Sequence, residues 1–554
     1  MTKNRLIYLP LGGAGEIGMN AYVYGYGPKG RERLILVDLG VTFPDMDTTP
    51  GVNLIMPDIS FLRENADRLE AIFITHGHED HVGAIGRLWP ELRVPVHARA
   101  FTGDLARLKL EDAGQDPDIV QIAEPFPARV EAGPFCVSFV PLSHSIPESA
   151  GLVIDTPAGR IVHTGDFKID PTPGVGEPFD FDLWAEATKG RVRALVCDST
   201  NVFSPKPGRS EAGLAQPIAE LIAKAPHMVV ATTFASNVAR VKTLAEAGQA
   251  AGRSVCLLGR AMRRMIEVAV KTGIVADFPH TITPEDARDL PRESLMLIVT
   301  GSQGERRAAS AQLARGKYLG MSMAEGDMFL FSSKTIPGNE RGVGRIHNAF
   351  SEMGVEVVAE DDRYHVSGHA NRPDLERMHA LVEPEIVVPM HGEHRHLREH
   401  AKLAEAGGRA AVIVPNGAVC DLTGVTPHIV EHVEADRVYL DGDILIGALD
   451  GVVRDRIRLA LNGHVIVNLI LEEDEVLGDP WVDTMGLPET GRSRAPLVDV
   501  LEEDLGQFVA RAGRKTLADD ARLEEELRRI ARKSCSDEIG RKPEITVVVS
   551  RLEG

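Results

Sequence analysis

The most informative part of the hydrophobic pattern is a short apolar run that ends in a cluster of histidines. Residues 71–74 (Ala-Ile-Phe-Ile) are β-branched and aromatic, which predicts a buried strand. The polar stretch directly after it, residues 75–81, reads Thr-His-Gly-His-Glu-Asp-His. Imidazole and carboxylate groups hold Zn²⁺ or Mn²⁺ in hydrolytic sites. Because crowding such groups at a strand end is costly without a cation, the pattern favours a metal site over a His-rich polar loop.

Further strands precede this cluster, separated by a glycine-rich turn. Residues 13–18 match GxGxxG after the strand 5–9, and Asp38 lies twenty residues beyond Gly18, as in a dinucleotide-binding fingerprint. That fingerprint requires a helix next, whereas residues 21–25 and 34–37 predict a hairpin of two strands. The sequence therefore argues against a dinucleotide site. We expect Asp38, at a strand end, to orient a metal-binding histidine instead.

Other metal-ligand side chains also follow apolar strands. His144 comes after the strand 135–140, Asp166 after 160–162, and His391 after 385–390. A lone His or Asp in such a place usually caps a turn. The repeated placement indicates that these groups meet at one end of the strands.

These residues resemble a known family. The set His76-x-His78-x-Asp80-His81, His144 and Asp166 resembles the dinuclear hydrolase signature of the metallo-β-lactamase fold. Three later motifs resemble those of the β-CASP branch, whose members act on nucleic acids: Asp198 within 196–201, Ser-Gly-His-Ala at 367–370, and Pro-Met-His-Gly-Glu at 389–393.

Three other segments, 233–237, 300–305 and 336–340, are similar to bacterial ribonuclease J, and this resemblance covers nearly the whole chain. One departure is Arg306-Arg307, where members of the family tend to have proline and an apolar residue. That difference puts an RNA contact at this point in question and does not touch the metal ligands.

The resemblance implies an α/β fold: a metallo-β-lactamase αββα sandwich with an inserted β-CASP α/β domain and a small C-terminal α/β domain. The pattern agrees, because strands such as 228–231 and 295–299 alternate with helices such as 237–251, which predicts a parallel sheet. Near the C-terminus we expect strands at 457–461, 464–471 and 545–549 and a helix at 519–533. The expected divisions are a first metallo-β-lactamase part at 1–207, the β-CASP domain at 208–365, a second metallo-β-lactamase part at 366–439, a Gly- and Asp-rich linker at 440–456, and the C-terminal domain at 457–554.

The same resemblance implies a two-metal site with a separate proton donor. One ion is assigned to His76, His78 and His144, and the other to Asp80, His81 and His391, with Asp166 bridging. Two cations ~3.5–4 Å apart can activate a shared water and clamp a phosphodiester. Zn²⁺ is expected, with Mn²⁺ as the alternative. The catalytic residues are taken to be Asp80 together with His369, the candidate general acid, and Asp198, which holds it. His394, His396 and His400 are expected at the surface.

A pocket for a 5′-phosphate is expected beside the metals. Its predicted members are His365, Ser367, the backbone N–H groups around Gly368, and His369, with Ser236 and Asn237 at a helix start. The alternative is that His365 and Ser367 only cap the turn. With the pocket, the resemblance implies 5′→3′ exonuclease activity that prefers 5′-monophosphate RNA, beside endonuclease activity, in RNA maturation and mRNA decay.

Composition limits the cellular setting. The 554 residues are 43 % hydrophobic and 26 % charged, as in a soluble globular protein, and no apolar run is long enough to span a bilayer. Residues 1–5 do not read as a signal peptide, and the five scattered cysteines suit a reducing compartment, so we expect a cytoplasmic protein.

The formal net charge of −20 argues against a protein that coats nucleic acid non-specifically, but it does not exclude an RNA substrate. A local cluster of Lys and Arg lies at positions 260, 263, 264, 306, 307, 315 and 317. A solvated helix face explains any one of these charges equally well.

Alternatives from other classes remain open. The first is a purely endonucleolytic β-CASP enzyme that acts on RNA or DNA, and the second is a scaffold protein that has lost its metals. The intact ligand set argues against the scaffold, and a lactamase or thioesterase has no use for the long insertion. The resemblance also implies a homodimer or homotetramer, supported by the C-terminal domain, with RNA-decay proteins as candidate partners.

Overall fold

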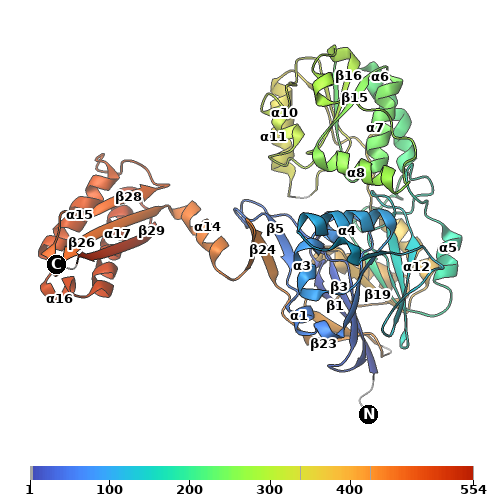
Figure 1. The fold of residues 1–554 in the computed structure, drawn as a ribbon, viewed down its shortest axis with the longest axis horizontal. Coiled ribbons are helices and arrows are strands. Elements are labelled where there is room, and N and C mark those ends of the chain that lie inside the picture. The colour runs from blue at the N-terminus through green and yellow to red at the C-terminus, as the bar shows by residue number, and fades with distance from the viewer. Residues whose placement is uncertain (1–3, 337, 425, 474, 553–554) are drawn as a thin grey trace. The chain divides into compact units, whose positions relative to one another are not determined.

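The computed structural model describes residues 4–552 except 337, 425 and 474 (Figure 1). Pro337, within the motif 336–340, and residues 1–3 therefore lie outside the described residues. The chain divides into two compact units. One comprises Met1–Thr42 and Met56–Arg437, and the other comprises Phe43–Ile55 and Val438–Gly554.

The first unit is built on two sheets that face each other across a hydrophobic core. In the first sheet the strand order is β23 (His428–His432), β22 (Ala418–Asp421), β1 (Asn4–Gly12), β3 (Ala21–Pro28), β4 (Arg33–Val37), β6 (Leu69–Phe73), β7 (Val96–Ala98) and β8 (Val120–Ile122). In the second sheet it is β21 (Ala410–Ala411), β19 (Ile386–Met390), β13 (Val192–Asp198), β12 (Gly159–His163), β11 (Ala150–Thr156), β10 (Phe135–Pro141) and β9 (Val130–Ala132). Alternate side chains of both sheets, such as Tyr24, Phe73 and Phe139, fill the space between them.

Helices cover the outer faces of these sheets. On the first sheet, α4 (Ala100–Asp112) packs on β7 and β8 and against α3 (Ile85–Leu92). On the second sheet, α5 (Phe181–Ala187), α12 (Arg372–Val382) and α13 (His394–Ala406) bury their apolar sides around Trp184. This arrangement confirms the predicted αββα sandwich.

The glycine-rich segment forms strands, as expected. β1 pairs antiparallel with β3, and β3 pairs antiparallel with β4, so no helix follows Gly18. The short strand β2 (Ala14–Gly15) instead pairs with β20 (Gly392–Glu393), directly after His391. The segment therefore braces the loop that carries a predicted metal ligand.

Inserted between β13 and β19 is a five-stranded parallel sheet (Figure 1). Its strand order is β15 (Ser254–Leu258), β16 (Leu295–Val299), β14 (Val229–Thr232), β17 (Met328–Phe331) and β18 (Glu356–Val358). One face packs on α6 (Ala215–Lys224), α7 (Val238–Ala250) and α8 (Arg260–Lys271), and the other on α9 (Pro284–Ala287), α10 (Ala309–Ala314) and α11 (Glu340–Glu352). Because both faces are covered, its strands are nearly continuous apolar runs. We refer to it below as the inserted domain.

The second unit contains a small mixed sheet backed by helices. β26 (His464–Glu472) pairs antiparallel with β27 (Glu475–Val476) and β28 (Trp481–Met485) and parallel with β29 (Glu544–Leu552). The apolar sides of α15 (Leu497–Arg511) and α17 (Asp520–Ile539) cover one face. The predicted strand 464–471, helix 519–533 and strand 545–549 are confirmed.

One predicted element in this unit is wrong. Residues 457–461 were expected to form a strand, but they lie inside α14 (Val452–Asn462). Ile457, Leu459 and Leu461 recur every second residue, as in a strand, but Val453, Ile457 and Leu461 also recur every four residues, which is the spacing of a helix. The segment predicted as a linker also holds regular structure, because β24 (Arg437–Asp441) and β25 (Ile444–Gly447) form a hairpin there. No helix among the described residues is long and apolar enough to cross a membrane.

Candidate metal centre and active site

The histidine-rich loop is fixed at the end of β6 by the two segments beside it. Gly40 lies so close to Asp80 that a Cβ on it would meet the Asp80 carbonyl oxygen at 1.7 Å. Leu39 N–H donates to the carbonyl of His81 at 2.8 Å, and Asn20 N–H donates to that of Asp80 at 2.9 Å. These backbone contacts hold the loop rigid, and they require a glycine at position 40.

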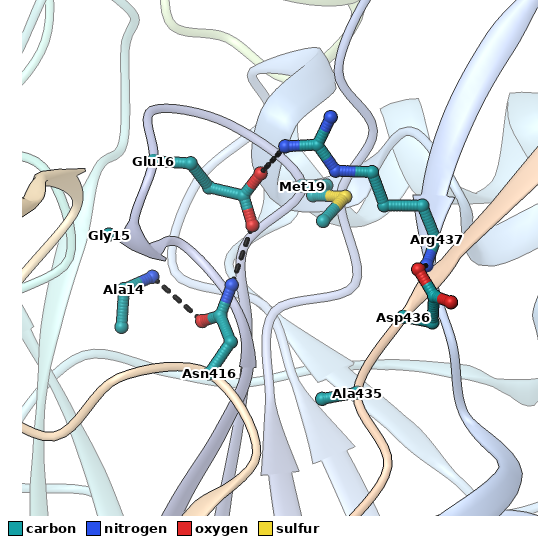
Figure 2. Close-up of a pocket in the computed structure, with 8 residues that line it drawn as sticks. All are labelled: Ala14, Gly15, Glu16, Met19, Asn416, Ala435, Asp436 and Arg437. Atoms are coloured by element: carbon teal, nitrogen blue, oxygen red, sulfur yellow. Dashed lines mark hydrogen bonds and ion pairs between the residues drawn. The ribbon is translucent and has the colours of Figure 1, made fainter. Parts of the chain in front are cut away.

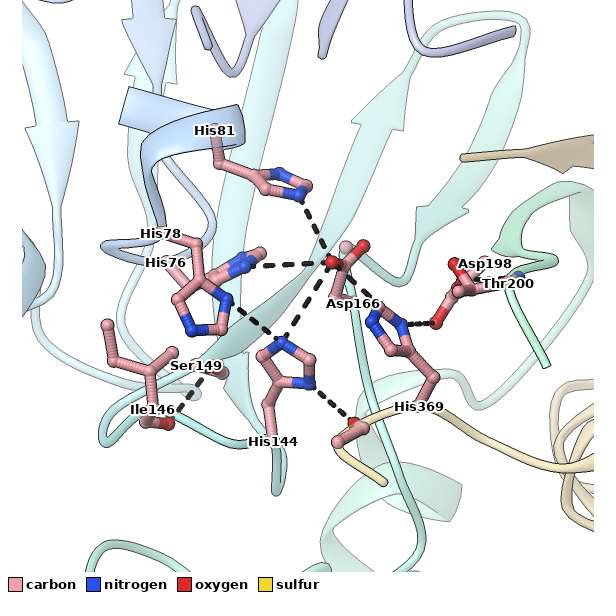
Figure 3. Close-up of polar contacts among 12 residues, drawn as sticks. His76, His78, His81, His144, Ile146, Ser149, Asp166, Asp198, Thr200 and His369 are labelled. Atoms are coloured by element: carbon pink, nitrogen blue, oxygen red, sulfur yellow. Dashed lines mark hydrogen bonds and ion pairs between the residues drawn. The ribbon is translucent and has the colours of Figure 1, made fainter. Parts of the chain in front are cut away.

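One carboxylate lies at the centre of the histidines (Figure 3). Oδ2 of Asp166 is 3.2 Å from Nε2 of His81, 3.8 Å from Nε2 of His76 and 3.9 Å from Nε2 of His144. The ligand atoms of His76, His78, His144 and Asp166 all lie within 4.8 Å of one another, and so do those of Asp80, His81, Asp166 and His391. The structure therefore brings all seven predicted ligands together in the two predicted groups, which share Asp166.

The chemistry of these atoms fits a pair of cations. Nε2 of His76 is buried and has no hydrogen-bond partner among the described residues, although it faces Asp166. Burial, with the neighbouring imidazoles, lowers the pKa of His76 and of His144 well below the usual range. Burial also lowers the pKa of His78, to about 4. These three rings are therefore neutral at pH 7, which is the form that binds a metal.

The second group is held by carboxylates. Nδ1 of His81 lies 2.7 Å from Oδ2 of Asp38, whose other contacts come from Thr75. Nε2 of His391 lies 3.1 Å from Oδ2 of Asp80. Burial lowers the pKa of His391, but Asp166, Asp198 and Asp80 outweigh it and raise the value to about 10. A cation held by Asp80, His81, Asp166 and His391 would take the place of that proton. The outer contact of Asp38 with His81 is the one expected from the sequence.

His369 lies at the edge of the metal centre and is tied to Asp198 (Figure 3). Its Nδ1 is 2.9 Å from Oδ2 of Asp198. Burial lowers the pKa of His369, but Asp198 more than compensates and raises it above the usual value. Asp198 therefore favours the protonated ring, and Nε2 is the nitrogen that remains to donate a proton.

Two residues that the sequence did not single out hold this arrangement. Asn201 Nδ2 donates to Ser367 Oγ at 2.7 Å and to the carbonyl of His369 at 3.3 Å. Thr200 Oγ1 lies 2.7 Å from Oδ1 of Asp198 and 3.0 Å from Nδ1 of His391. Their one sequence signal is that they directly follow Asp198 in the run Asp-Ser-Thr-Asn.

The predicted pocket residues have mixed surroundings. Ser367 Oγ accepts hydrogen bonds from Asn201 and from the N–H of His369, so it does cap the turn, and its own proton remains free to donate. Burial, with the charges of Arg240, Lys334 and Lys168, lowers the pKa of His365 to about 3, so this ring is neutral. Arg240 NH1 approaches its Nδ1 at 3.5 Å, which leaves Nε2 as the N–H donor.

Two further pocket residues are engaged elsewhere. Asn237 Oδ1 accepts from the N–H of Arg240 at 2.9 Å and so caps α7, and Ser236 Oγ lies 3.0 Å from Nε2 of His78. The carbonyl of Gly368 is 2.5 Å from Nδ1 of His144. Ser236 on one side of the predicted pocket thus contacts His78, and Gly368 on the other side contacts His144, so each side touches a predicted metal ligand.

Two of the histidines expected at the surface are buried, which corrects that prediction. His400 bonds Ser199 Oγ at 2.9 Å and its Nε2 lies 3.0 Å from Nε2 of His379. The two rings lie only 9° from parallel, with centroids 5.1 Å apart. This is the geometry of a direct N–H···N hydrogen bond, because two rings joined in one plane have this centroid separation. His396 is also buried, and of these three histidines only His394 is exposed, because α13 turns His396 and His400 toward the sheet.

A separate cavity of about 260 Å³ lies beside the glycine-rich turn (Figure 2). Its charged groups already pair with one another, since Glu16 bonds Arg437 at 2.6 Å and Asn416 at 2.6 Å. Arg306 and Arg307 are exposed on the inserted domain, and Gln303 Oε1 nearby accepts hydrogen bonds from the N–H of Ile336 at 2.8 Å and from Nδ2 of Asn339 at 3.3 Å. The motifs 300–305 and 336–340 therefore brace one another.

Comparison with known proteins agrees with this architecture. Residues 15–197 match the metallo-beta-lactamase superfamily, 226–350 the ribonuclease J beta-CASP domain, 354–415 the Zn-dependent metallo-hydrolase RNA specificity domain, and 451–552 the ribonuclease J C-terminal domain. The chain is 40 % identical to ribonuclease J of Sinorhizobium meliloti over 99 % of its own length and 97 % of that protein. The chain belongs to the ribonuclease J family.

Two further proteins are also similar to this chain. The enzyme of Corynebacterium glutamicum is 35 % identical over 95 % of this chain and 73 % of its own length. A solved structure of an Enterococcus faecalis protein of unknown function covers 75 % of this chain and 100 % of its own, with a TM-score of 0.53 at 17 % identity. That structure supports the fold alone.

Proposed function

We propose that this chain is a metal-dependent ribonuclease that degrades RNA in the 5′→3′ direction from a 5′-monophosphate end, with additional endonuclease activity, in cytoplasmic RNA maturation and mRNA decay. One observation carries the proposal. In a chain of the ribonuclease J family, two groups of candidate metal ligands share Asp166, and His369, which is paired with Asp198, stands beside them.

Two divalent ions are proposed, one per ligand group, with Zn²⁺ expected and Mn²⁺ as the alternative. Three neutral imidazoles in the first group suit Zn²⁺, whereas the two carboxylates in the second also suit Mn²⁺. When bound, such ions activate water and stabilise the charge that develops on a phosphodiester. Asp38, Thr75 and Thr200 contact the rings of His81, His76 and His391, and so would orient the groups that hold these ions.

His369 is proposed to protonate the departing 3′-oxygen. Asp198 fixes the ring by its contact with Nδ1, so Nε2–H is directed away from Asp198 and is available to the substrate. Asn201 holds the carbonyl of His369 and so limits how far the ring can move. Histidine is suited to this role because its proton can be given up and regained near neutral pH.

The 5′-phosphate is proposed to bind between Ser367, His365 and the N–H groups around Gly368. A neutral His365 supplies an N–H donor from Nε2, and Ser367 supplies its hydroxyl proton. Arg240, Lys334 and Lys168 provide a positive field at His365. A 5′-triphosphate is larger and carries more charge, so we expect it to enter less readily.

The proposal extends to assembly. The open face of the C-terminal sheet exposes Trp481 (53 %) and Met485 (72 %), which is unusual for a monomer surface. A homodimer or homotetramer that covers this face is proposed, and RNA-decay proteins are further candidate partners.

The test is a nuclease assay with two RNAs that differ only at the 5′ end. The purified chain is incubated with 3′-labelled and internally labelled RNA that carries a 5′-monophosphate or a 5′-triphosphate, with and without a chelator. We expect mononucleotides, faster loss of the monophosphate RNA, and no cleavage with chelator. Internal cuts alone, equal for both 5′ ends, would instead support the purely endonucleolytic alternative.

A further inference from the structure

The two proposed ion sites are supported by different parts of the chain. In the second group, Nδ1 of His81 is held by Asp38 at 2.7 Å and Nδ1 of His391 by Thr200 Oγ1 at 3.0 Å. Both supports stand directly beside strands of the metallo-β-lactamase sandwich, β4 and β13. The first group differs, because one of its supports comes from the inserted domain: Ser236 Oγ lies 3.0 Å from Nε2 of His78.

The ring nitrogens of His78 have distinct partners. Nδ1 lies 3.1 Å from Nε2 of His144, and both atoms face the space shared with Asp166. Nε2 of His78 is therefore the outer nitrogen, and when Nδ1 binds an ion, Nε2 carries the proton. Ser236 Oγ then accepts from it, an outer contact of the kind that fixes the ring orientation of a metal ligand.

Ser236 is placed by the fold of the inserted domain. It follows β14 in a tight turn, in which Asn237 N–H donates to the carbonyl of Phe234 at 3.1 Å. Asn237 then caps α7, and the fully buried Arg240 on that helix pairs with Glu211 at 2.5 Å. The position of the serine oxygen relative to the metallo-β-lactamase sheets therefore follows the position of the whole inserted domain.

The turn between the first two ligands is packed from the same side. A Cβ on Gly77 would meet Cδ1 of Leu105 at 2.5 Å and Cδ1 of Ile146 at 3.4 Å. Leu105 and Ile146 belong to the sandwich, and together with Phe101 they pack in one hydrophobic cluster with residues of β14 and α7 of the inserted domain. The inserted domain thus contacts the outer nitrogen of His78 directly, through Ser236, and the backbone turn only through Leu105 and Ile146 of the sandwich.

We propose that Ser236 is a positioning residue that makes ion binding by His76, His78, His144 and Asp166 depend on the docked inserted domain, whereas the other ion site has its supports within the sandwich. The inference rests on the two-ion site of the proposed function. The two ion sites differ in which part of the chain supplies their outer hydrogen bonds. Ser236 then serves metal binding as well as the proposed phosphate pocket.

The test measures metal retention and needs no RNA. The full-length protein, loaded with Zn²⁺, is equilibrated with increasing concentrations of a chelator, and the zinc that stays bound is measured by elemental analysis. The variants are Ser236→Ala, the conservative Ser236→Thr, and Asp38→Asn. The matched control is Ser310→Ala, which removes a serine of the inserted domain whose Oγ donates to the carbonyl of Gly301 at 2.7 Å.

For Ser236→Ala we expect one of two bound zinc ions to be lost at about 10- to 100-fold lower chelator activity, the usual effect of removing an outer partner. Ser236→Thr and Ser310→Ala should retain zinc as the wild type does, and Asp38→Asn should weaken the other ion. The inference would be overturned if Ser236→Ala lowered the retention of both ions equally or of neither. It would also be overturned if Ser310→Ala lost zinc as Ser236→Ala does. A wild-type protein that holds a single ion would overturn the two-ion site and this inference together, whereas the nuclease assay is independent of the Ser236 result.

Discussion

Nδ1 of His369 lies 2.9 Å from Oδ2 of Asp198, and this contact decides which ring nitrogen is available for proton transfer. The carboxylate holds Nδ1–H, so only Nε2 can donate to a substrate. The two residues are 171 positions apart in the sequence, on opposite sides of the inserted domain. The proposed general acid is therefore assembled only when both flanks of the insertion are in place.

Replacement of this acid should slow the reaction without loss of metal. We expect His369→Ala to lower turnover by about 10²- to 10⁴-fold, the range for loss of a positioned proton donor. Single-turnover cleavage of 5′-monophosphate RNA measures the effect, and elemental analysis should find unchanged zinc. Near-normal turnover would show that the leaving oxygen takes its proton from another group.

Removal of a ligand from the second ion should be more severe. Asp80→Ala or His81→Ala should abolish hydrolysis, because each supplies one of the few ligand atoms around Asp166. Circular dichroism should show a fold close to the wild type, since the backbone contacts of Asp80 and His81 with Asn20 and Leu39 do not involve the side chains. Elemental analysis of the active wild-type protein provides the control, and the absence of any transition metal there would refute the two-ion site.

The proposed phosphate pocket makes a separate prediction. Ser367→Val adds bulk and removes the hydroxyl that Asn201 contacts, so release of mononucleotides should fall more than internal cleavage. Ser367→Thr keeps the hydroxyl and is the matched comparison. Both activities are measured on one RNA that carries a terminal and an internal label. A proportional loss of both in Ser367→Val would argue that this serine only caps its turn.

Assembly can be tested at a boundary that the structure defines. Because α14 spans Val452–Asn462, a chain that ends at Gly451 removes the helix whole, whereas a cut near Asp455 would leave a fragment of it. Light scattering should show a smaller assembly for the shortened chain. Trp481→Lys, which charges the open sheet face, should have the same effect in the full-length protein. Unchanged mass in both proteins would place the subunit contact elsewhere.

Acid stability should depend on the buried histidine pair of α12 and α13. Burial, followed by the nearby His400 and Arg409, lowers the pKa of His379 to about 2, and burial lowers that of His400 to about 4. Below pH 6.5 the unfolded chain therefore binds more protons at these positions than the native chain does, so the free energy of unfolding falls as the pH falls. The stabilisation is complete above about pH 6.5 and is lost on acidification.

We expect His379→Gln to lower the melting temperature at pH 7 and to flatten its fall between pH 6.5 and pH 5. One proton fewer taken up on unfolding corresponds to about 1.4 kcal/mol per pH unit. The exposed His394 on α13 gives the control, because His394→Gln should leave the slope unchanged. If the melting temperature of His379→Gln fell as steeply with pH as that of the wild type, other groups would control acid unfolding.

The sequence predicted the parts of the site that depend on local order. Asp166 and His391 follow strands of the second sheet that run in the same direction, and His76 follows a strand of the first sheet, so the repeated placement at strand ends allowed their convergence to be expected. The outer contact of Ser236 with His78 joins residues 158 positions apart, and no local pattern carries it. The burial of His400 escaped prediction because histidine is tolerated on either face of a helix, and its buried partner, His379, lies on another one.

The order in which strands enter the two sheets has a consequence for synthesis of the chain on the ribosome. The inserted sheet is built from one continuous stretch, β14 to β18, so it can fold as soon as that stretch has emerged. The sandwich cannot be completed before β19, β21, β22 and β23 are synthesised, and these strands follow the insertion in the chain. His391 lies directly after β19, at the end of a long incomplete intermediate. A nascent chain therefore cannot complete the candidate metal centre until β19 and His391 have been synthesised, which happens only after the whole insertion.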